Sequence, residues 1–289
     1  MTTLGASNAH AISMTGTFDD CQDLVKAAFA DAAFRDEVHL SAVNSINWAR
    51  VMAQIVYYVT AHLAVAPDGG PVTYVVPTGN FGNILAGWVA KRMGLPVERL
   101  VVASNRNDIL TRFFTTGTME IRGVVPTTSP SMDIQVSSNL ERLLFEVLGR
   151  DGAAVAEMMA RFRSDGTVSV PVEVLDVLRD EFDCGRLDDE SSAEVIRRVH
   201  GRSGMLVDPH TAVGIGVAES TTGDPSVPVV TLATAHPAKF PDAVEAATGI
   251  RPPLPEHLAD LFERPERVEH VDAELASVQA LVRAEVSCS

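Results

Sequence analysis

Val72-Thr73-Tyr74-Val75-Val76-Pro77-Thr78-Gly79-Asn80-Phe81-Gly82-Asn83 decides the fold of this chain, because it joins an apolar run typical of a buried strand to a turn with two glycines. Residues 84–94 follow with apolar positions at helical spacing and a glycine, Gly94, where a helix would end. Free N–H groups and the positive end of the helix dipole at such a junction bind anions, and glycines let the backbone approach a phosphate closely. Taken alone, a Gly-x-x-Gly pattern favours a tight strand-to-helix turn, because short glycine motifs often match by chance.

The composition is that of an ordinary globular protein, long enough for one large domain or two modest ones, with 46% hydrophobic and 21% charged residues in 289. Its net charge of −15 argues against a nucleic-acid or anionic-membrane partner but not against a small anionic substrate. Three scattered cysteines indicate neither a disulfide framework nor a metal site, and a reducing cytoplasm is expected. Residues 1–16 lack the pattern of a secretory signal, and the apolar stretch 51–66 is too polar to span a membrane.

Strand and helix patterns alternate along the chain, which predicts a parallel α/β sheet. Asp19 or Asp20 is expected to cap the first helix, and residues 123–138 are expected to be irregular. Strands are expected at 9–14, 72–76, 99–103 and 227–233, with an extended segment at 168–174. Helices are expected at 21–33, 44–63, 84–94, 107–115, 139–149, 153–162, 191–200, 208–219, 241–248 and 272–286.

An ordered set of motifs resembles the threonine synthases of bacterial and fungal type. Each motif alone is weak, but the set in this order is highly specific, and it covers the chain from about Asn8 to the last helix. The motifs are Gly16-Thr17-Phe18-Asp19-Asp20-Cys21-Gln22, Asn44-Ser45-Ile46-Asn47 with Arg50, Pro77 to Asn83, Ser129-Pro130-Ser131-Met132-Asp133-Ile134, Ser137-Ser138-Asn139-Leu140-Glu141-Arg142, Asp208-Pro209-His210-Thr211-Ala212, and Thr234-Ala235-His236-Pro237-Ala238-Lys239-Phe240.

This resemblance implies the tryptophan-synthase-β-like fold of pyridoxal-phosphate enzymes, fold type II, a three-layer α/β fold on a parallel sheet that is incomplete at the N-terminus here. Three segments are then expected. Residues 1–124 hold the cofactor-binding α/β part, 125–205 form a mostly helical segment specific to threonine synthases, and 206–289 complete the α/β domain and add terminal helices.

The resemblance also implies the cofactor-binding residues. Gly79, Asn80, Phe81, Gly82 and Asn83 are expected to cradle the phosphate of pyridoxal 5'-phosphate. Thr234 follows a strand of buried type, and in enzymes of this fold a Ser or Thr hydroxyl commonly faces the pyridine nitrogen and tunes the ring as an electron sink. The alternative for Thr234 is a strand-end residue that caps the next turn.

Asn47, Arg50 and Lys239 are expected to bind substrate. Asn47 and Arg50 lie three residues apart on one helix face, and the guanidinium of Arg50 suits a bidentate contact with a phosphate or carboxylate. The alternative is a structural ion pair. Lys239 is expected to contact the substrate phosphate or to satisfy local backbone carbonyls instead.

Ser131 and Asp133 lie in a proline-flanked loop and are expected to order the substrate side of the site, or else to stabilise their own loop. His210 follows Asp208-Pro209 and is expected to belong to a capped helix start. No metal ligand set is expected.

The implied reaction converts O-phosphohomoserine and water to threonine and phosphate, with a Schiff-base lysine moving protons as general base and acid. The family carries that lysine in an N-terminal portion that precedes the motifs found here. The chain has three lysines, Lys26, Lys91 and Lys239, and none occupies the catalytic position. The chain alone is therefore expected to be inactive.

Three interpretations follow. The chain is a C-terminal fragment of a threonine synthase, a non-catalytic relic that binds pyridoxal phosphate or a phosphoamino acid, or a subunit that completes a separate lysine-bearing chain. The fragment interpretation predicts a large exposed apolar face where the remaining portion packs. The relic interpretation predicts ligand binding without turnover.

Overall fold

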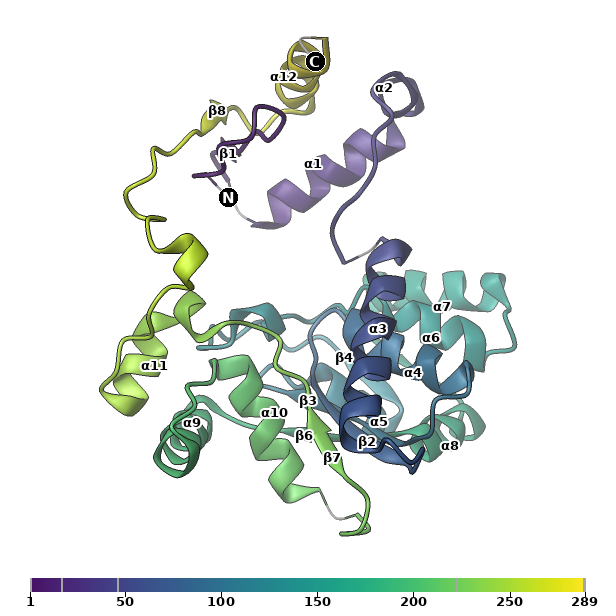
Figure 1. The fold of residues 1–289 in the computed structure, drawn as a ribbon. Helices are drawn as coiled ribbons and strands as arrows, with labels where there is room; N and C mark the ends of the chain where they lie inside the picture. The colour runs from purple at the N-terminus through teal and green to yellow at the C-terminus, as the bar shows by residue number, and fades with distance from the viewer. Residues whose placement is uncertain (1, 17, 46, 222, 288–289) are drawn as a thin grey trace. The chain divides into compact units, whose positions relative to one another are not determined.

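A computed structural model describes residues 2–16, 18–45, 47–221 and 223–287, which cluster into two compact units (Figure 1). One unit comprises Met1–Ala42 with Leu254–Ser289, and the other comprises Val43–Pro253. The expected three-part division at residues 124 and 205 stays a prediction. Thr17, Ile46 and Cys288, which the sequence patterns include, lie outside the described residues.

The larger unit is built on a four-stranded parallel sheet with the strand order β6-β3-β2-β7. The strands are β2 (Val72–Pro77), β3 (Val97–Ser104), β6 (Phe182–Arg186) and β7 (Val229–Thr231). All six residues of β2 are buried, as expected for a central strand of a parallel sheet. The strand preceding Thr234 is different from the buried strand that we expected, because β7 is an edge strand whose Val229 is 50% exposed.

Helices cover both faces of this sheet (Figure 1). Alternate residues of β2 face the two helical layers. Tyr74 and Val76 pack in the larger core with α3 (Trp48–Val65), α4 (Gly82–Arg92) and α5 (Ile109–Thr116). Val75 packs in a second core with α10 (Pro209–Ser220). The predicted three-layer arrangement is confirmed.

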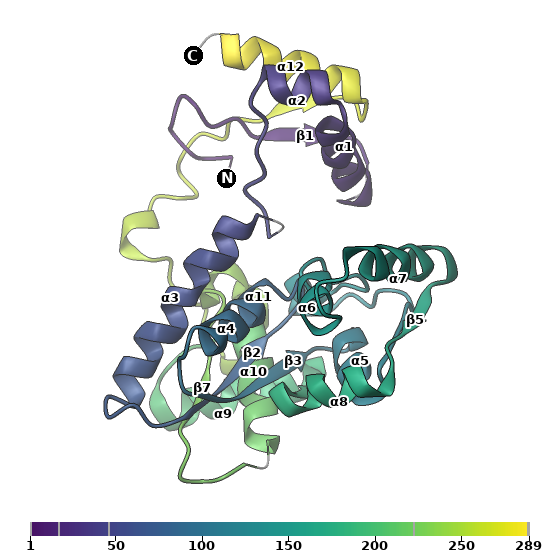
Figure 2. The ribbon, with the colours of Figure 1, turned by 90° about the vertical axis from the view of Figure 1, so that its right-hand side faces the viewer.

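A mostly helical segment extends from the α5 side of the sheet. It contains η1 (Pro130–Met132), α6 (Leu140–Val147), α7 (Gly152–Asp165) and α8 (Val172–Glu181), and the antiparallel pair β4 (Thr118–Glu120) and β5 (Thr167–Ser169). The prediction of an extended segment over 168–174 is wrong beyond residue 169. Strand β5 is short and leads into α8 (Figure 2). Helix α8 begins after Pro171 and buries Leu175 and Leu178.

The remaining helices of this unit are α9 (Asp189–Ser203), η2 (Pro237–Lys239) and α11 (Pro241–Thr248). α9 packs against α10 and α11 through a third apolar cluster that includes Val195, Ala212 and Val244. The predicted helix at 241–248 is confirmed at both ends.

The smaller unit pairs β1 (Ile12–Met14) with β8 (Glu269–Val271) in parallel. Its other elements are α1 (Phe18–Ala30), α2 (Ala32–Glu37), η3 (Glu256–Leu258) and α12 (Leu275–Ser287). The expectation that Asp19 or Asp20 caps the first helix is wrong, because α1 begins at Phe18 and both residues lie inside it.

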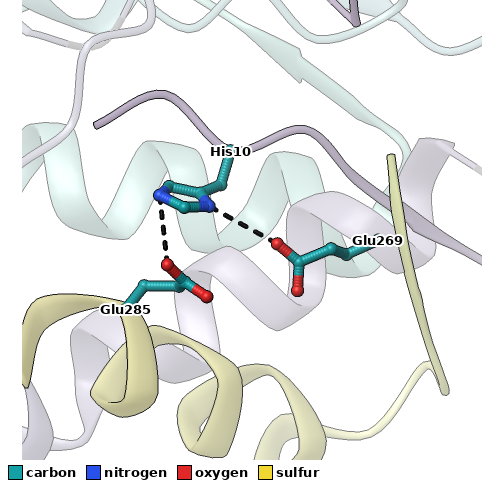
Figure 3. Close-up of side chains that lie close together, drawn as sticks. All are labelled: His10, Glu269 and Glu285. Atoms are coloured by element: carbon teal, nitrogen blue, oxygen red, sulfur yellow. Dashed lines mark hydrogen bonds and ion pairs between the residues drawn. The ribbon is translucent and has the colours of Figure 1, made fainter. Parts of the chain in front are cut away.

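His10 links three segments of the smaller unit (Figure 3). Its Nδ1 lies 3.4 Å from Glu269 on β8, and its Nε2 lies 3.2 Å from Glu285 on α12. One nitrogen of His10 and one carboxylate oxygen from each glutamate, the atoms that could bind a metal ion, lie within 4.8 Å of one another. The two ring nitrogens face different carboxylates, whereas a metal ion would bind one ring nitrogen, so the geometry fits two side-chain contacts better than a metal site. Among the described residues, no helix is long and apolar enough to cross a membrane.

Candidate functional site

A cavity of about 500 Å³ lies at the carboxyl end of β2. Its walls come from the start of α3, the turn between β2 and α4, and the segment that follows β7. The lining residues are Ser45, Arg50, Val51, Gln54, Tyr57, Pro77, Thr78, Gly79, Asn80, Phe81, Gly82, Asn83, Leu232, Ala233 and Thr234.

The strand order explains why a cavity forms here. From β2 the chain proceeds to β3 on one side and only much later returns to β7 on the other side. The strand order therefore reverses between β2 and β7, and such a reversal opens a crevice outside the carboxyl ends of the two strands. Ligands of parallel α/β proteins bind at such switch points.

Phe81 gives the turn its shape. Its backbone is left-handed (φ 61°, ψ 4°), a conformation that costs a bulky residue about 1–3 kcal/mol. Its ring is 1% exposed and packs at 6.0 Å from Phe114 and 5.9 Å from Phe182, centroid to centroid. The buried ring thus holds the backbone in this conformation, and only the backbone of Phe81 is left to contact a ligand.

The loop 129–139 supports the turn from behind. Ser137 Oγ donates to the Gly79 carbonyl at 2.8 Å, and the backbone N–H and Nδ2 of Asn139 donate to the Asn80 carbonyl at 3.1 and 2.8 Å. Because C=O and N–H point in opposite directions across a trans peptide, the N–H groups of Asn80 and Phe81 point away from this loop.

These features fit the phosphate ester of a cofactor. No side chain caps α4, and no hydrogen bond to the N–H groups of Gly82 or Asn83 is formed within the described part of the chain. Gly79 is required, since a Cβ there would lie 2.3 Å from the Ser131 carbonyl oxygen. A free helix N-terminus beside a glycine-lined cavity of this size is suited to a phosphorylated ligand.

All the predicted cofactor residues and one predicted substrate residue line the cavity. Gly79 to Asn83, Thr234 and Arg50 all line it, and Arg50 Nη1 donates to the Val43 carbonyl at 3.0 Å. Asn47 is not among the lining residues, and its role at the substrate stays a prediction. It is the N-cap of α3 and accepts a hydrogen bond from the Ala49 N–H at 2.8 Å.

Ser131, Asp133 and Lys239 are not among the lining residues. The Asp133 carboxylate accepts hydrogen bonds from Asn105, Asn107 and Thr127, which favours the alternative that it stabilises its own loop. Lys239 lies in η2 with its Nζ 6.0 Å from the centre of the Phe240 ring. A role for these three residues at the substrate stays a prediction.

Gln54 and Tyr57 were missed at the sequence level. With Arg50 they are spaced by four and three residues, so α3 presents all three along one stripe. Their polarity within an otherwise apolar helix was the available signal.

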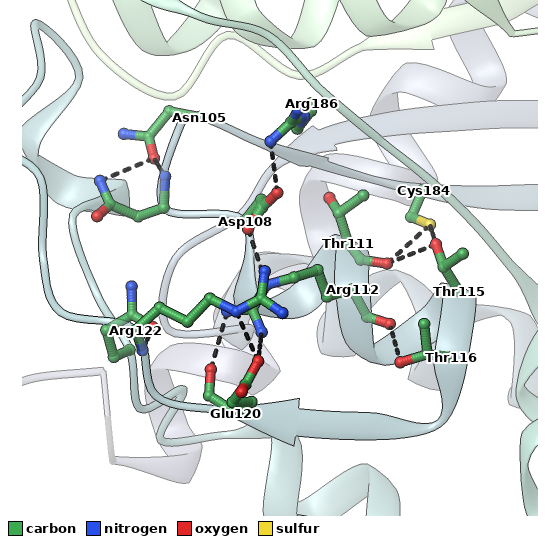
Figure 4. Close-up of polar contacts among 12 residues, drawn as sticks. Asn105, Asp108, Thr111, Arg112, Thr115, Thr116, Glu120, Arg122, Cys184 and Arg186 are labelled. Carbon is green, nitrogen blue, oxygen red and sulfur yellow. Dashed lines mark hydrogen bonds and ion pairs between the residues drawn. The ribbon is translucent and has the colours of Figure 1, made fainter. Parts of the chain in front are cut away.

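A separate ionic cluster fixes the start of α5 (Figure 4). The Asp108 carboxylate lies 2.9 Å from Nε of Arg112 and 2.7 Å from Nη1 of Arg186. Nη1 of Arg112 also lies 3.4 Å from Oε2 of Glu120. None of these residues lines the cavity. The cluster is therefore structural, although it lies near the carboxyl ends of β3 and β6.

Two buried tyrosines support the turn from the α3 side. Tyr58 Oη donates to the Asn83 carbonyl at 2.9 Å, and Tyr74 Oη donates to the Tyr58 carbonyl at 3.1 Å. Burial raises the pKa of the Tyr58 phenol well above its usual value, and burial raises the pKa of Tyr74 to about 12.

Alkaline pH is therefore expected to destabilise the chain. The protonated tyrosines are favoured in the folded state, so this stability is fully present below the unfolded-state pKa of about 10 and decreases as the pH rises from there toward 12. Urea unfolding of the chain and of Tyr74→Phe between pH 9 and 11.5 measures this loss. Tyr74→Phe should show a shallower dependence, and an equal slope in both proteins would contradict the assignment.

Comparisons with known proteins identify the family. A family model described as pyridoxal-phosphate dependent enzyme matches residues 1–235, and one described as threonine synthase, C-terminal, matches residues 211–282. The threonine synthase of Pseudomonas aeruginosa is 53% identical over 283 residues, which cover 98% of this chain and 60% of the relative. This chain thus spans about three fifths of the length of that relative.

Two solved structures are similar over nearly the whole chain. The pyridoxal-phosphate-bound threonine synthase from Brucella melitensis is 52% identical, with a TM-score of 0.92. The similarity covers 99% of this chain and 61% of the Brucella chain. The threonine synthase from yeast is 38% identical, with a TM-score of 0.89. The similarity covers 100% of this chain and 62% of the yeast chain. The predicted fold of type II and its cofactor, pyridoxal phosphate, are confirmed for the family. The chain belongs to the pyridoxal-phosphate-dependent enzymes, and within them it is similar to the threonine synthases.

Proposed function

We propose that this chain is part of a threonine synthase that converts O-phosphohomoserine and water to threonine and phosphate. The observation that carries the proposal is the turn 77–83, whose residues line a cavity at the switch point of a parallel sheet and whose Gly82 and Asn83 N–H groups are unpaired within the described part of the chain. In this proposal the turn holds the phosphate of pyridoxal phosphate through the N–H groups of Gly82 and Asn83.

The cavity walls would hold the rest of the ligands. When bound, the cofactor supplies an electron sink for proton removal from the substrate. Arg50 would pair with the carboxylate or phosphate of the substrate, held in place by its bond to the Val43 carbonyl. Thr234, in the segment that follows β7, would offer its hydroxyl to the ring nitrogen. Gln54 and Tyr57 would contact the substrate beside Arg50.

We propose that the lysine-dependent proton transfer is supplied by polypeptide outside this sequence. None of the chain's three lysines lines the cavity. Lys26 lies in α1 of the other compact unit, and Lys91 lies 2.8 Å from Glu181. The isolated chain would therefore bind the cofactor without turnover.

A cytoplasmic location is part of the proposal. Cys21 and Cys184 are free thiols, which suits a reducing compartment. The substrate and product are small polar metabolites, and the net charge of −15 gives no support to a nucleic-acid partner.

An exposed apolar stripe on α3 marks where further polypeptide would pack. The stripe consists of Trp48, Met52, Val56, Val59 and Leu63, which are 47%, 54%, 56%, 37% and 63% exposed. Their spacing of four, four, three and four residues places them along one face, next to the face that α3 buries. Soluble monomers rarely expose so continuous an apolar surface. Because the relatives are longer than this chain, we propose that the remaining portion of a threonine synthase packs on this stripe.

Reconstitution tests the proposal. The full chain is mixed with the segment of the Pseudomonas aeruginosa relative that it does not span, and phosphate release and threonine formation from O-phosphohomoserine are measured. We expect cofactor binding by the chain alone and turnover only in the mixture. Turnover by the chain alone would refute the external lysine. Binding without turnover in the mixture would favour a relic, and no binding at all would refute the cofactor site.

The stripe has its own matched variants. The double substitution Met52→Glu with Val56→Glu should weaken association with the added segment about 30-fold or more, because two central apolar contacts are replaced by charges. Val172→Glu, at a residue that is 62% exposed on α8, should leave association unchanged. Equal effects of the two variants in a sedimentation or titration experiment would contradict the docking surface.

A further inference from the structure

Ser131 stands between the cofactor turn and a buried histidine. Its carbonyl oxygen occupies the space where a side chain of residue 79 would be, 2.3 Å from the position of a Gly79 Cβ. Its N–H donates to Nε2 of His210 at 3.1 Å. A single peptide segment thus connects His210 to the turn that lines the cavity.

The contacts of His210 define its tautomer. Because the Ser131 N–H donates to Nε2, that nitrogen carries a lone pair, so the proton of the neutral ring is on Nδ1. Nδ1–H then donates to Asp208 Oδ1 at 2.8 Å. The ring is 3% exposed and packs against the Phe240 ring, with centroids 4.7 Å apart.

Asp208 fixes this tautomer. It is fully buried, caps α10 through the N–H groups of His210 and Thr211, and also accepts from the Thr211 hydroxyl. Burial raises the pKa of its carboxyl, but the hydrogen bonds from His210 and Thr211 outweigh this and lower the pKa overall. The carboxylate therefore remains an acceptor for Nδ1–H, and α10 itself packs on the sheet through Val213 and Val217.

We propose that His210 is a positioning residue for the cofactor turn. By accepting a hydrogen bond from the Ser131 N–H, it holds the Ser131 carbonyl against Gly79. The position of the turn at the cavity is thereby fixed. A histidine suits this position because its neutral ring accepts at one end and donates at the other, linking Ser131 to the rigid start of α10. The consequence for the cofactor rests on the proposed function.

Two substitutions distinguish the hydrogen bond at Nε2 from the hydrogen bond at Nδ1. In His210→Gln the side-chain carbonyl reaches the place of Nε2 and can still accept from Ser131. In His210→Asn the amide reaches only the place of Nδ1, so it can donate to Asp208 but not accept from Ser131. Hydrogen exchange of the Ser131 amide, followed by NMR in the full chain without ligand, and the dissociation constant for pyridoxal phosphate are measured for both.

We expect His210→Asn to speed exchange of the Ser131 amide and to weaken pyridoxal phosphate binding, each by about 5- to 10-fold, as loss of one hydrogen bond implies. His210→Gln should restore both values to near those of the parent chain. Equal effects of the two variants would overturn the proposal, since they would reflect loss of packing alone. If the parent chain does not bind pyridoxal phosphate, the proposed function fails, and the exchange contrast still decides whether His210 holds the loop.

Discussion

Gly79→Ala is expected to weaken binding of pyridoxal phosphate by about 100-fold or more and to destabilise the chain. An alanine Cβ would lie 2.3 Å from the Ser131 carbonyl oxygen, 3.3 Å from its carbonyl carbon and 3.4 Å from Met132 Cα. All three are backbone atoms, so no rotation of a side chain relieves the contact. Either the loop or the turn has to move.

The loop resists this movement. Met132 is 2% exposed in the apolar cluster with Val213, and the Ser131 N–H is bound to His210. The turn therefore moves, and the N–H groups of Gly82 and Asn83 lose their alignment on an anion. Overpacking of this kind costs about 1–3 kcal/mol of folding stability. Loss of two hydrogen bonds to a charged phosphate weakens binding about 100-fold or more.

Gly201→Ala is the matched control. It lies in α9 with no atom within 4 Å of the added Cβ, and alanine should raise the stability of that helix by up to about 1 kcal/mol. Absorbance titration with pyridoxal phosphate and thermal unfolding compare the two variants. A Gly79→Ala chain that binds like the parent would show that the turn does not form the phosphate site.

Local sequence patterns were sufficient to predict the central strands of the fold and the turn that lines the cavity. The run 72–76, the turn and the following helix were predictable because burial, glycine and helical spacing all act within a few residues. The N-cap role of Asn47 is also predictable, since asparagine is a preferred N-cap, but α3 begins at Trp48 and not at residue 44, where the apolar pattern places its start. β6 was missed because Phe-Asp-Cys-Gly-Arg has no apolar run.

Contacts between distant segments could not be predicted in this way. The backing of Gly79 by Ser131 and the link from Ser131 to His210 join three segments whose proximity depends on the sheet order and on α10. Likewise, β7 has an apolar sequence but lies at the sheet edge, because no described strand pairs with its outer side. The exposed face of α3 followed from the fragment interpretation, although its residues were not predicted.

Phe81→Ala is expected to cost about 3–5 kcal/mol of stability, a large part of the 5–15 kcal/mol typical of a domain. The 1%-exposed ring would leave a cavity between Phe114 and Phe182. The ring also holds residue 81 in its left-handed conformation, so its loss frees the turn to relax toward an ordinary helix start. The N–H groups that face the cavity would then be misplaced, and cofactor affinity would fall along with stability.

Two further variants distinguish the packing of the Phe81 ring from the left-handed backbone conformation of residue 81. Phe114→Ala removes a ring that is 2% exposed from the same cluster but lies outside the turn, so it should lower stability by a similar amount with little loss of affinity per folded molecule. Phe81→Gly loses the anchor but tolerates positive φ, and it should be about 1 kcal/mol more stable than Phe81→Ala. Urea unfolding gives the stabilities, and titration with pyridoxal phosphate at low denaturant gives the affinities. If Phe114→Ala weakens binding as much as Phe81→Ala does, the aromatic cluster as a whole, rather than the left-handed residue within the turn, sets the geometry of the site.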